Sequence, residues 1–198
     1  SEASIGESKL YQNRPVLVED IAEFDFSQVQ LAFFAVPAAV SQDYAGRAIS
    51  AGCKVVDLSA GFRGDQSVPL VVAGVNGQLL EGRDADLVAT PDALAIDLSQ
   101  VLNPINANTE IIRVNAASYQ AVSSVGREGS KELAKQTAGL LNGLPVEPEV
   151  FSQQIAFNVL PCVDELLASG HSSAELGLMS ELRRLMDDDQ FAISATCV

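Results

Sequence analysis

The pattern of apolar and polar positions in the first half of the chain predicts alternating strands and a helix. The run Leu31–Val36 is apolar throughout, which is typical of a strand buried on both faces. Ser41 is predicted to cap a helix, and Lys54–Asp57 then forms a second short strand. A strand, a helix and a strand of these lengths make a crossover unit, so the two strands should be parallel. Further strands are expected at Val68–Val72 and Leu87–Ala89.

The pattern changes after residue 90. Thr90 and Pro91 are predicted to open a helix, as its cap and its first residue, and Asn103–Pro104 should end it. Two later segments, Glu110–Ala117 and Phe191–Val198, are expected to be strands of a second sheet. We therefore predict an α/β protein with two domains, residues 1–91 and residues 92–198.

Two more helices are predicted in the second half. Glu128–Leu141 has the spacing of an amphipathic helix. Ser172 and Glu175 stand three residues apart before an apolar helical pattern, and this spacing predicts a capping box for a helix that continues to Met186.

Composition narrows the class of protein. The 198 residues are 47% hydrophobic and 19% charged, which is unlike a disordered chain. The formal net charge of −14 argues against nucleic acid or an anionic membrane surface as a partner. The longest apolar run is too short to span a bilayer, and the first residues lack the layout of a signal peptide. Three scattered cysteines fit a reducing compartment. We expect a soluble cytoplasmic protein.

The chain offers few reactive side chains. His171 is the only histidine and is expected in a solvated loop, so no metal site is predicted. Each of the three cysteines, Cys53, Cys162 and Cys197, is expected to be a small buried apolar residue. Asp92 is expected in the first turn of its helix, where an acidic side chain is favourable.

Four motifs occur in a characteristic order: Val55–Arg63 (VVDLSAGFR), Val68–Asn76 (VPLVVAGVN), Tyr119–Ser123 (YQAVS) and Ile155–Pro161 (IAFNVLP). With them the sequence resembles the aspartate-semialdehyde dehydrogenase family across essentially its whole length, and most closely the paralogues labelled USG proteins. The resemblance implies a partial Rossmann-type NADP-binding domain. It also implies a second, α+β domain like that of glyceraldehyde-3-phosphate dehydrogenases, for catalysis and for dimerisation. Family enzymes interconvert a semialdehyde and an acyl phosphate through a cysteine thioester.

The resemblance assigns roles to six positions. Gln120 matches the glutamine that orients the intermediate, and Arg63 matches a phosphate-binding arginine. Glu175 falls at the glutamate that meets the substrate amine, while Ser123 and Gly126 lie in a loop that approaches the nicotinamide. Asp92 stands at the position of the nucleophilic cysteine.

Several positions depart from the family pattern. Gly177 stands where a phosphate-binding lysine is expected, Leu58 replaces an asparagine, and Val36–Pro37 replaces a turn of small residues. The resemblance also places the glycine-rich turn before Ser1, and a catalytic arginine and histidine after Val198. A carboxylate is a poor substitute for a thiolate, because it would give a mixed anhydride in place of a thioester.

Three hypotheses follow from the sequence. The chain is a family dehydrogenase or a relative with altered NADP-linked activity, or a non-catalytic homodimer that binds a ligand or a partner subunit, or a fragment whose missing ends hold the discriminating residues. Because Asp92 stands in place of the nucleophile, we expect weak or no family activity. The apolar segments around Ile111, Ile155 and Leu176 exceed what a domain of this size can bury, which favours the dimer.

Overall fold

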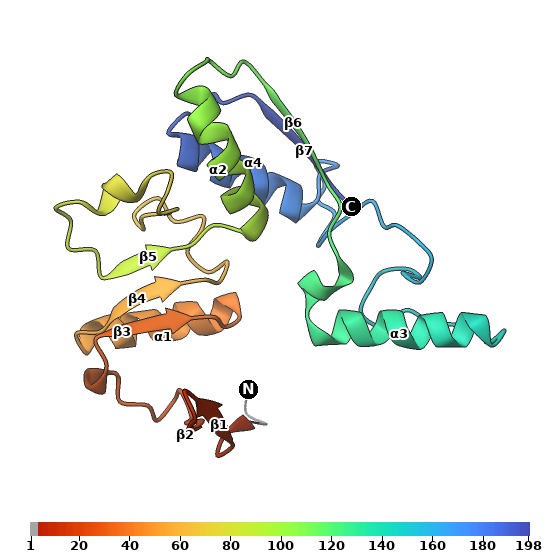
Figure 1. The fold of residues 1–198 in the computed structure, drawn as a ribbon, viewed down its shortest axis with the longest axis horizontal. Helices are drawn as coiled ribbons and strands as arrows, with labels where there is room; N and C mark the ends of the chain where they lie inside the picture. The colour runs from red at the N-terminus through yellow and green to blue at the C-terminus, as the bar shows by residue number, and fades with distance from the viewer. Residues whose placement is uncertain (1–3) are drawn as a thin grey trace. The chain divides into compact units, whose positions relative to one another are not determined.

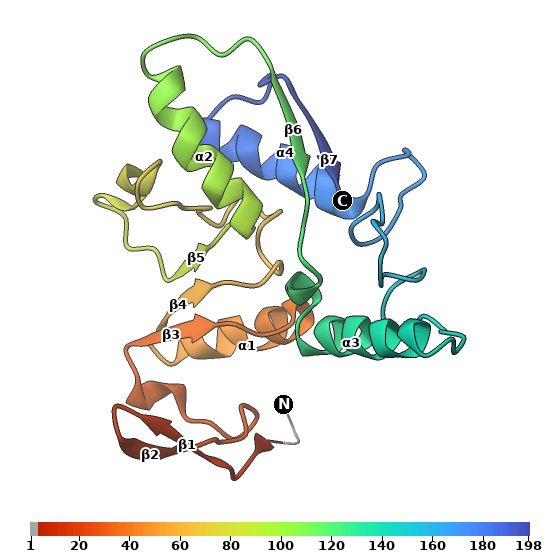
Figure 2. The ribbon, with the colours of Figure 1, turned by 45° about the vertical axis from the view of Figure 1, so that its right-hand side comes forward.

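The computed structural model describes residues 4–198, and the chain divides into two compact units. The first comprises Ser1–Val71 and Gly77–Thr90, and the second comprises Val72–Asn76 and Pro91–Val198. Figures 1 and 2 give the labels of the elements in each unit. These units are groups of residues in mutual contact, whereas a domain is a part of the chain that can fold on its own. The predicted domains, residues 1–91 and 92–198, therefore stay a prediction.

A three-stranded parallel sheet forms the centre of the first unit. Its strands β3 (Leu31–Phe34), β4 (Lys54–Asp57) and β5 (Leu87–Ala89) lie in the order β3-β4-β5. Helix α1 (Ala38–Ser50) connects β3 to β4, so the predicted parallel crossover unit is confirmed. The helix packs on the sheet through a buried cluster of Phe26, Phe34, Ala45, Ala48, Cys53 and Val55.

The expectation that β3 is buried on both faces is wrong. Phe34 is buried, but Leu31 is 49% exposed and Phe33 is 66% exposed. In the part of the chain that the structure describes, α1 covers one face of this edge strand and the other face stays largely open.

The predicted strand Val68–Val72 is reduced to a single bridge, between Leu70 and Ala89. Two hydrogen bonds flank it, from Ala89 N–H to the carbonyl of Pro69 and from Val71 N–H to the carbonyl of Ala89. The ladder stops there because the carbonyl of Val72 accepts from the next turn instead.

The predicted cap of α1 is also wrong. The helix begins at Ala38 with Pro37 as its N-cap, and Ser41 lies inside its first turn. The Ser41 hydroxyl donates to Oδ1 of Asp57 at 2.6 Å, and both side chains are completely buried. A buried carboxylate needs donors, so this contact fixes the place of Ser41 more strongly than its preference for caps.

An antiparallel hairpin that the sequence pattern did not predict precedes the sheet. Its strands β1 (Ser8–Tyr11) and β2 (Arg14–Leu17) are exposed along their whole length. Gln12 and Asn13 have φ values of 48° and 62°, as a tight two-residue hairpin turn requires. The described part of the first unit also contains the short 3₁₀ helices Phe26–Gln28 and Gly77–Leu80.

The second unit is built on a parallel pair of strands, β6 (Val114–Ser118) and β7 (Ile193–Cys197), which confirms the predicted second sheet. Helix α4 (Ser173–Met186) packs against β7, and α2 (Ala93–Asn106) packs against α4 (Figure 2). The large buried side chains of this core are Leu102, Leu178, Met179, Leu182, Leu185, Phe191 and Ile193.

Helix α2 differs from its prediction at both ends. Asp92 is the N-cap, in place of Thr90, because its side chain accepts from Leu94 N–H. Pro104 lies inside the helix, which continues to Asn106. Proline has no amide donor for the carbonyl four residues earlier, and this near the end of a helix the loss is confined to the last turn. Separately, Asn108 Nδ2 donates to the carbonyl of Pro104 at 2.8 Å.

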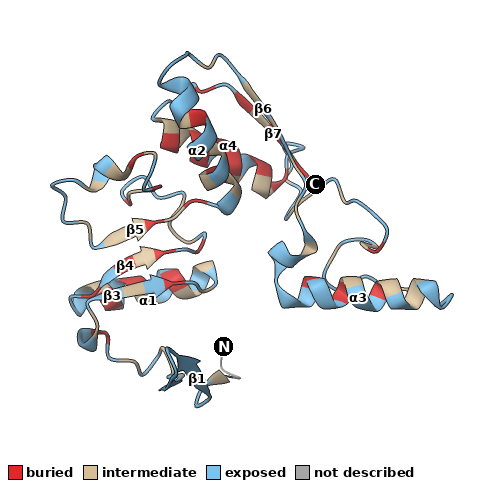
Figure 3. Cartoon of the chain, in the orientation of Figure 1, coloured by how far each residue is buried: buried red, intermediate tan, exposed pale blue. Residues whose placement is uncertain are grey.

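Helix α3 (Arg127–Leu141) agrees with the predicted Glu128–Leu141 and turns a polar face inward. Its buried residues are Gly129, Glu132 and Gln136. Figure 3 shows buried positions on α3 by colour. Burial alone would raise the pKa of Glu132. The backbone N–H groups of residues 149–151 and the side-chain amide of Gln136 donate to its carboxylate, and these hydrogen bonds lower the pKa. The hydrogen bonds outweigh burial, so the pKa of Glu132 lies below its usual value. The segment after α3 is thereby held along the helix.

Candidate functional site

The turn that opens α2 carries Asp92. The exposed Asp92 side chain accepts from Leu94 N–H at 3.0 Å, and its carbonyl accepts from Ile96 N–H at 2.9 Å. Its own backbone N–H donates to Oε2 of Glu181 at 2.6 Å. Glu181 belongs to α4, is 6% exposed, and was not anticipated from the sequence because 89 residues separate the two positions.

Glu175 is held by the backbone on two sides. Its Oε2 accepts from Ser172 N–H at 2.9 Å and its Oε1 accepts from Cys197 N–H at 3.1 Å. With Ser172 it forms the predicted capping box. These amide donors, helped by His171 at 3.6 Å from Oε2, lower the pKa of Glu175, although its burial acts in the opposite direction. Glu175 is 9% exposed, and its predicted role in binding the substrate amine stays a prediction.

Gln120 follows β6 and lies beside the end of β7. Its backbone N–H donates to the carbonyl of Val198 at 2.7 Å, and the N–H of Val198 donates to the backbone carbonyl of Ser118 at 2.9 Å. The Glu175–Cys197 hydrogen bond holds the same strand end. The structure thus brings two predicted site residues, Gln120 and Glu175, to the two sides of one strand terminus.

Ser123 and Gly126 lie in and directly after the 3₁₀ helix Val122–Val125, which precedes α3. Gly126 has φ 84° and donates its N–H to the carbonyl of Ser123 at 2.9 Å. Gly129 allows this turn to approach α3, since a Cβ there would lie 2.6 Å from the carbonyl oxygen of Val122. The loop expected to approach a nicotinamide is therefore a tight turn fixed on a helix.

Arg63 belongs to the first unit. It follows β4, and its guanidinium donates to the carbonyls of Thr90 at 3.1 Å and Leu58 at 3.3 Å. Both carbonyls follow the carboxyl ends of parallel strands, which is the edge where ligands bind in such sheets. Its predicted role in phosphate binding stays a prediction.

The nicotinamide cofactor implied by the resemblance fits the first unit in part. Helix α1 begins at the carboxyl edge of the sheet, and its N-cap Pro37 provides no side-chain acceptor. Gly61 lies close beside this turn, because a Cβ there would be 3.0 Å from the carbonyl oxygen of Ala38. A helix N-terminus at this edge suits an anionic group. The 198 residues contain no GxGxxG sequence.

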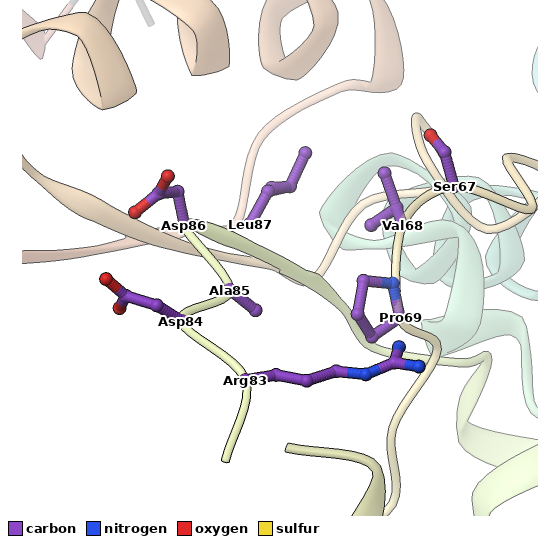
Figure 4. A pocket seen from close by; sticks show the side chains of 8 residues that line it. All are labelled: Ser67, Val68, Pro69, Arg83, Asp84, Ala85, Asp86 and Leu87. Atoms are coloured by element: carbon purple, nitrogen blue, oxygen red, sulfur yellow. The ribbon is translucent and has the colours of Figure 1, made fainter. Parts of the chain in front are cut away.

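An open hollow lies elsewhere, at the amino end of β5 (Figure 4). It is lined by Ser67, Val68, Pro69, Arg83, Asp84, Ala85, Asp86 and Leu87. None of the predicted site residues lines it, and it lies at the opposite end of the strand from Thr90.

The cysteines differ in burial. Cys53 and Cys197 are 1% exposed, as expected, and burial raises the pKa of the Cys53 thiol. Cys162 is only half-buried, so the expectation of burial is wrong there, because it lies in a loop. His171 is in a loop and its side chain is 47% exposed, in agreement with the prediction.

Two family models match the chain. The model described as "Semialdehyde dehydrogenase, NAD binding domain" matches residues 2–83, and the one described as "Semialdehyde dehydrogenase, dimerisation domain" matches residues 102–198. An aspartate-semialdehyde dehydrogenase of Legionella pneumophila is 39% identical over all of this chain and 57% of its own length. A USG-1 protein homolog of Pseudomonas aeruginosa is 41% identical over all of this chain and 59% of its own length.

A solved structure agrees with these matches. The crystal structure of aspartate semialdehyde dehydrogenase II from Vibrio cholerae complexed with ASA has a TM-score of 0.94 and 38% identity, over all of this chain and 59% of that one. The chain belongs to the semialdehyde dehydrogenase family, with an α/β fold of NAD-binding and dimerisation domains. It spans somewhat more than half the length of these relatives. Among residues 4–198, none of the helices is both long and apolar enough to cross a membrane.

Proposed function

We propose that this chain is part of an aspartate-semialdehyde-dehydrogenase-like protein with weak or no dehydrogenase activity. The observation that carries the proposal is the composition of the turn that opens α2. Residues 90–95 read TPDALA and contain no cysteine. The one acidic side chain of that turn, Asp92, already accepts the amide hydrogen of Leu94 as a helix cap.

The chemistry explains why this matters. A thiolate at a helix N-terminus adds to an aldehyde, and loss of hydride from the adduct to NADP leaves a thioester that phosphate can cleave. A carboxylate in the same place would give a mixed anhydride, which lacks the stabilisation of sulfur. None of Cys53, Cys162 and Cys197 belongs to the segment that opens α2.

The remaining parts of the proposal follow the family. The cofactor is NADP, the ligand is a small semialdehyde or acyl phosphate, and the protein is a cytoplasmic homodimer. The match to a dimerisation domain supports the dimer, as do the exposed apolar side chains Ile112, Phe157 and Val159. Arg63, Gln120, Ser123 and Gly126 would contact substrate or cofactor.

A second candidate is a non-catalytic homodimer that binds a ligand or a partner protein. The match to a dimerisation domain supports this candidate as well, because dimerisation requires no turnover. The two candidates differ in whether any turnover remains.

The test is an assay of the full-length protein with aspartate semialdehyde, phosphate and NADP. We expect a rate near background for the unchanged protein. We expect a detectable rate for D92C or A93C, which place a thiol at the N-cap or at the first helical residue, and none for the control S50C. Turnover by the unchanged protein on the order of 1–10³ s⁻¹, the range of ordinary enzymes, would disprove the proposal.

A further inference from the structure

Helix α4 provides acceptors for two separate backbone segments. Glu175 and Glu181 stand six residues apart, which places them on different sides of the helix. Glu175 accepts from the end of β7, and Glu181 accepts from the start of α2. Both residues are buried, with 9% of Glu175 and 6% of Glu181 exposed to solvent. A buried carboxylate is costly unless it receives hydrogen bonds, so these contacts set the positions of both segments.

The contact of Glu181 completes an arrangement that α2 lacks in its own sequence. In a capping box, a glutamate at the third helical residue accepts the N–H of the N-cap residue. In α2 that third residue is Ala95, which has no acceptor. Glu181 accepts the N–H of Asp92 at 2.6 Å, so a neighbouring helix supplies the missing half of the box.

We propose that Glu181 is the positioning residue of the turn at Asp92, and that it fixes this turn through the backbone amide while placing a negative charge beside it. The inference rests on the proposed function, which places the position of the family's nucleophile in this turn. The charge matters for chemistry there. It would oppose the stabilisation that a helix N-terminus gives to a thiolate introduced at Asp92, whereas the hydrogen bond preserves the helix end that supplies the stabilisation.

Two substitutions of Glu181 separate the effect of its charge from the effect of its hydrogen bond. Both are made in a chain that carries D92C, which introduces the thiol, and C162S, which removes the half-buried cysteine. Glu181→Gln keeps an oxygen acceptor and removes the charge, so the introduced thiol should become more acidic. Glu181→Leu removes the acceptor as well and loosens the helix end, so the thiol pKa should move toward about 8.5, the value of a free cysteine. The rate of iodoacetamide alkylation against pH, read by peptide mass spectrometry, gives both pKa values.

Asp97→Asn is the matched control, because it removes an exposed carboxylate from the same helix. We expect E181Q to raise the alkylation rate at pH 7 roughly threefold or more, as a nearby charge in a partly buried site implies, and D97N to change it little. Equal shifts for E181Q, E181L and D97N would overturn the proposal. If E181L does not fold, Glu181→Asp takes its place, since it keeps the charge and shortens the reach.

A second measurement uses the chain with Asp92 unchanged. Amide hydrogen exchange at Asp92 and Leu94, followed by NMR, should stay slow in E181Q and become on the order of tenfold faster in E181L, since the acceptor is lost. Unchanged exchange in both variants would contradict the inference. Neither measurement depends on turnover, so either can fail while the proposed lack of activity holds.

Discussion

The hydroxyl of Ser41 lies 2.6 Å from Oδ1 of Asp57, and neither side chain is exposed to solvent. This hydrogen bond joins the first turn of α1 to the end of β4, the strand that precedes Arg63. The same carboxylate oxygen also accepts the N–H of Ser59 at 3.2 Å. The pair therefore fixes the carboxyl edge of the first sheet from two sides.

Removal of this hydroxyl should destabilise the protein. Ser41→Ala leaves Oδ1 of the buried Asp57 with the N–H of Ser59 as its one remaining donor among the contacts described above. We expect the free energy of unfolding to fall by about 1–3 kcal/mol. Urea unfolding followed by circular dichroism measures the change. Ser50→Ala, at the exposed end of the same helix, is the control and should change stability by less than about 0.5 kcal/mol. Similar losses for both variants would contradict the structural role of the pair.

The contrast between Ser41 and Ser172 shows what the sequence could predict. The capping box of α4 is local, with its two members three residues apart, and the prediction was confirmed. Ser41 has the same preference for caps, but its partner Asp57 lies 16 residues away and burial decided its position. The strand predicted at Val68–Val72 failed for a similar reason, because pairing depends on the neighbouring strand and its turns.

The candidate site depends even more on distant contacts. The six site residues came from the family resemblance, and their roles remain predictions. Glu181 could not be found from local patterns, since its partner Asp92 is 89 residues away and a glutamate inside an amphipathic helix is ordinarily a surface residue. Only the packing of α2 on α4 shows that Glu181 is buried.

The pH dependence of stability should report on Glu175. Its folded-state pKa lies below its ordinary value of 4.5, mainly because Ser172 and Cys197 donate backbone hydrogen bonds to the carboxylate. A carboxylate with a lowered pKa stabilises the fold above the unfolded pKa, and the contribution is lost as the pH falls through the folded pKa. Glu175→Gln should therefore cost stability at pH 7 and progressively less below about pH 4.5.

The measurement is a series of urea titrations between pH 3 and pH 7 for both proteins. Glu128→Gln, at an exposed position of α3, is the control, because the pair of Glu128 with Lys131 is solvated and such pairs contribute little. A stability difference for E175Q that does not shrink toward acid would show that the carboxylate charge has no part in the contact.

Gly129 should be intolerant of a methyl group. A Cβ at this position would lie 2.6 Å from the carbonyl oxygen of Val122 and 3.2 Å from Cβ of Val125, so the turn that carries Ser123 would have to move. We expect Gly129→Ala to destabilise by about 1–3 kcal/mol, although alanine favours helices. Gly177→Ala in α4 meets nothing within 4 Å and should stabilise by about 0.5–1 kcal/mol. A gain in stability for both variants would disprove the close approach.

We expect Phe157 to be an anchor of the proposed dimer interface. It is 74% exposed, and its φ of 58° is unusual for an aromatic residue. The segment before it is fixed, because Oε1 of the buried Gln136 accepts the N–H groups of Ile155 and Ala156 at 2.9 and 3.1 Å. An exposed aromatic side chain on a backbone that is already ordered loses little entropy when it binds.

If the protein is a homodimer, Phe157→Asp should weaken it. Truncated aromatic anchors commonly cost 2 kcal/mol or more, which corresponds to a rise of roughly thirtyfold in the dimer dissociation constant. Aspartate tolerates positive φ, so the change should leave the backbone and the melting temperature largely unaltered. Sedimentation equilibrium gives the constant, and Leu10→Asp in the exposed hairpin, where Leu10 is 78% exposed, controls for the loss of an apolar surface. An equal dissociation constant for F157D and the unchanged protein would place the interface elsewhere, and a single-chain mass for the unchanged protein would reject the dimer.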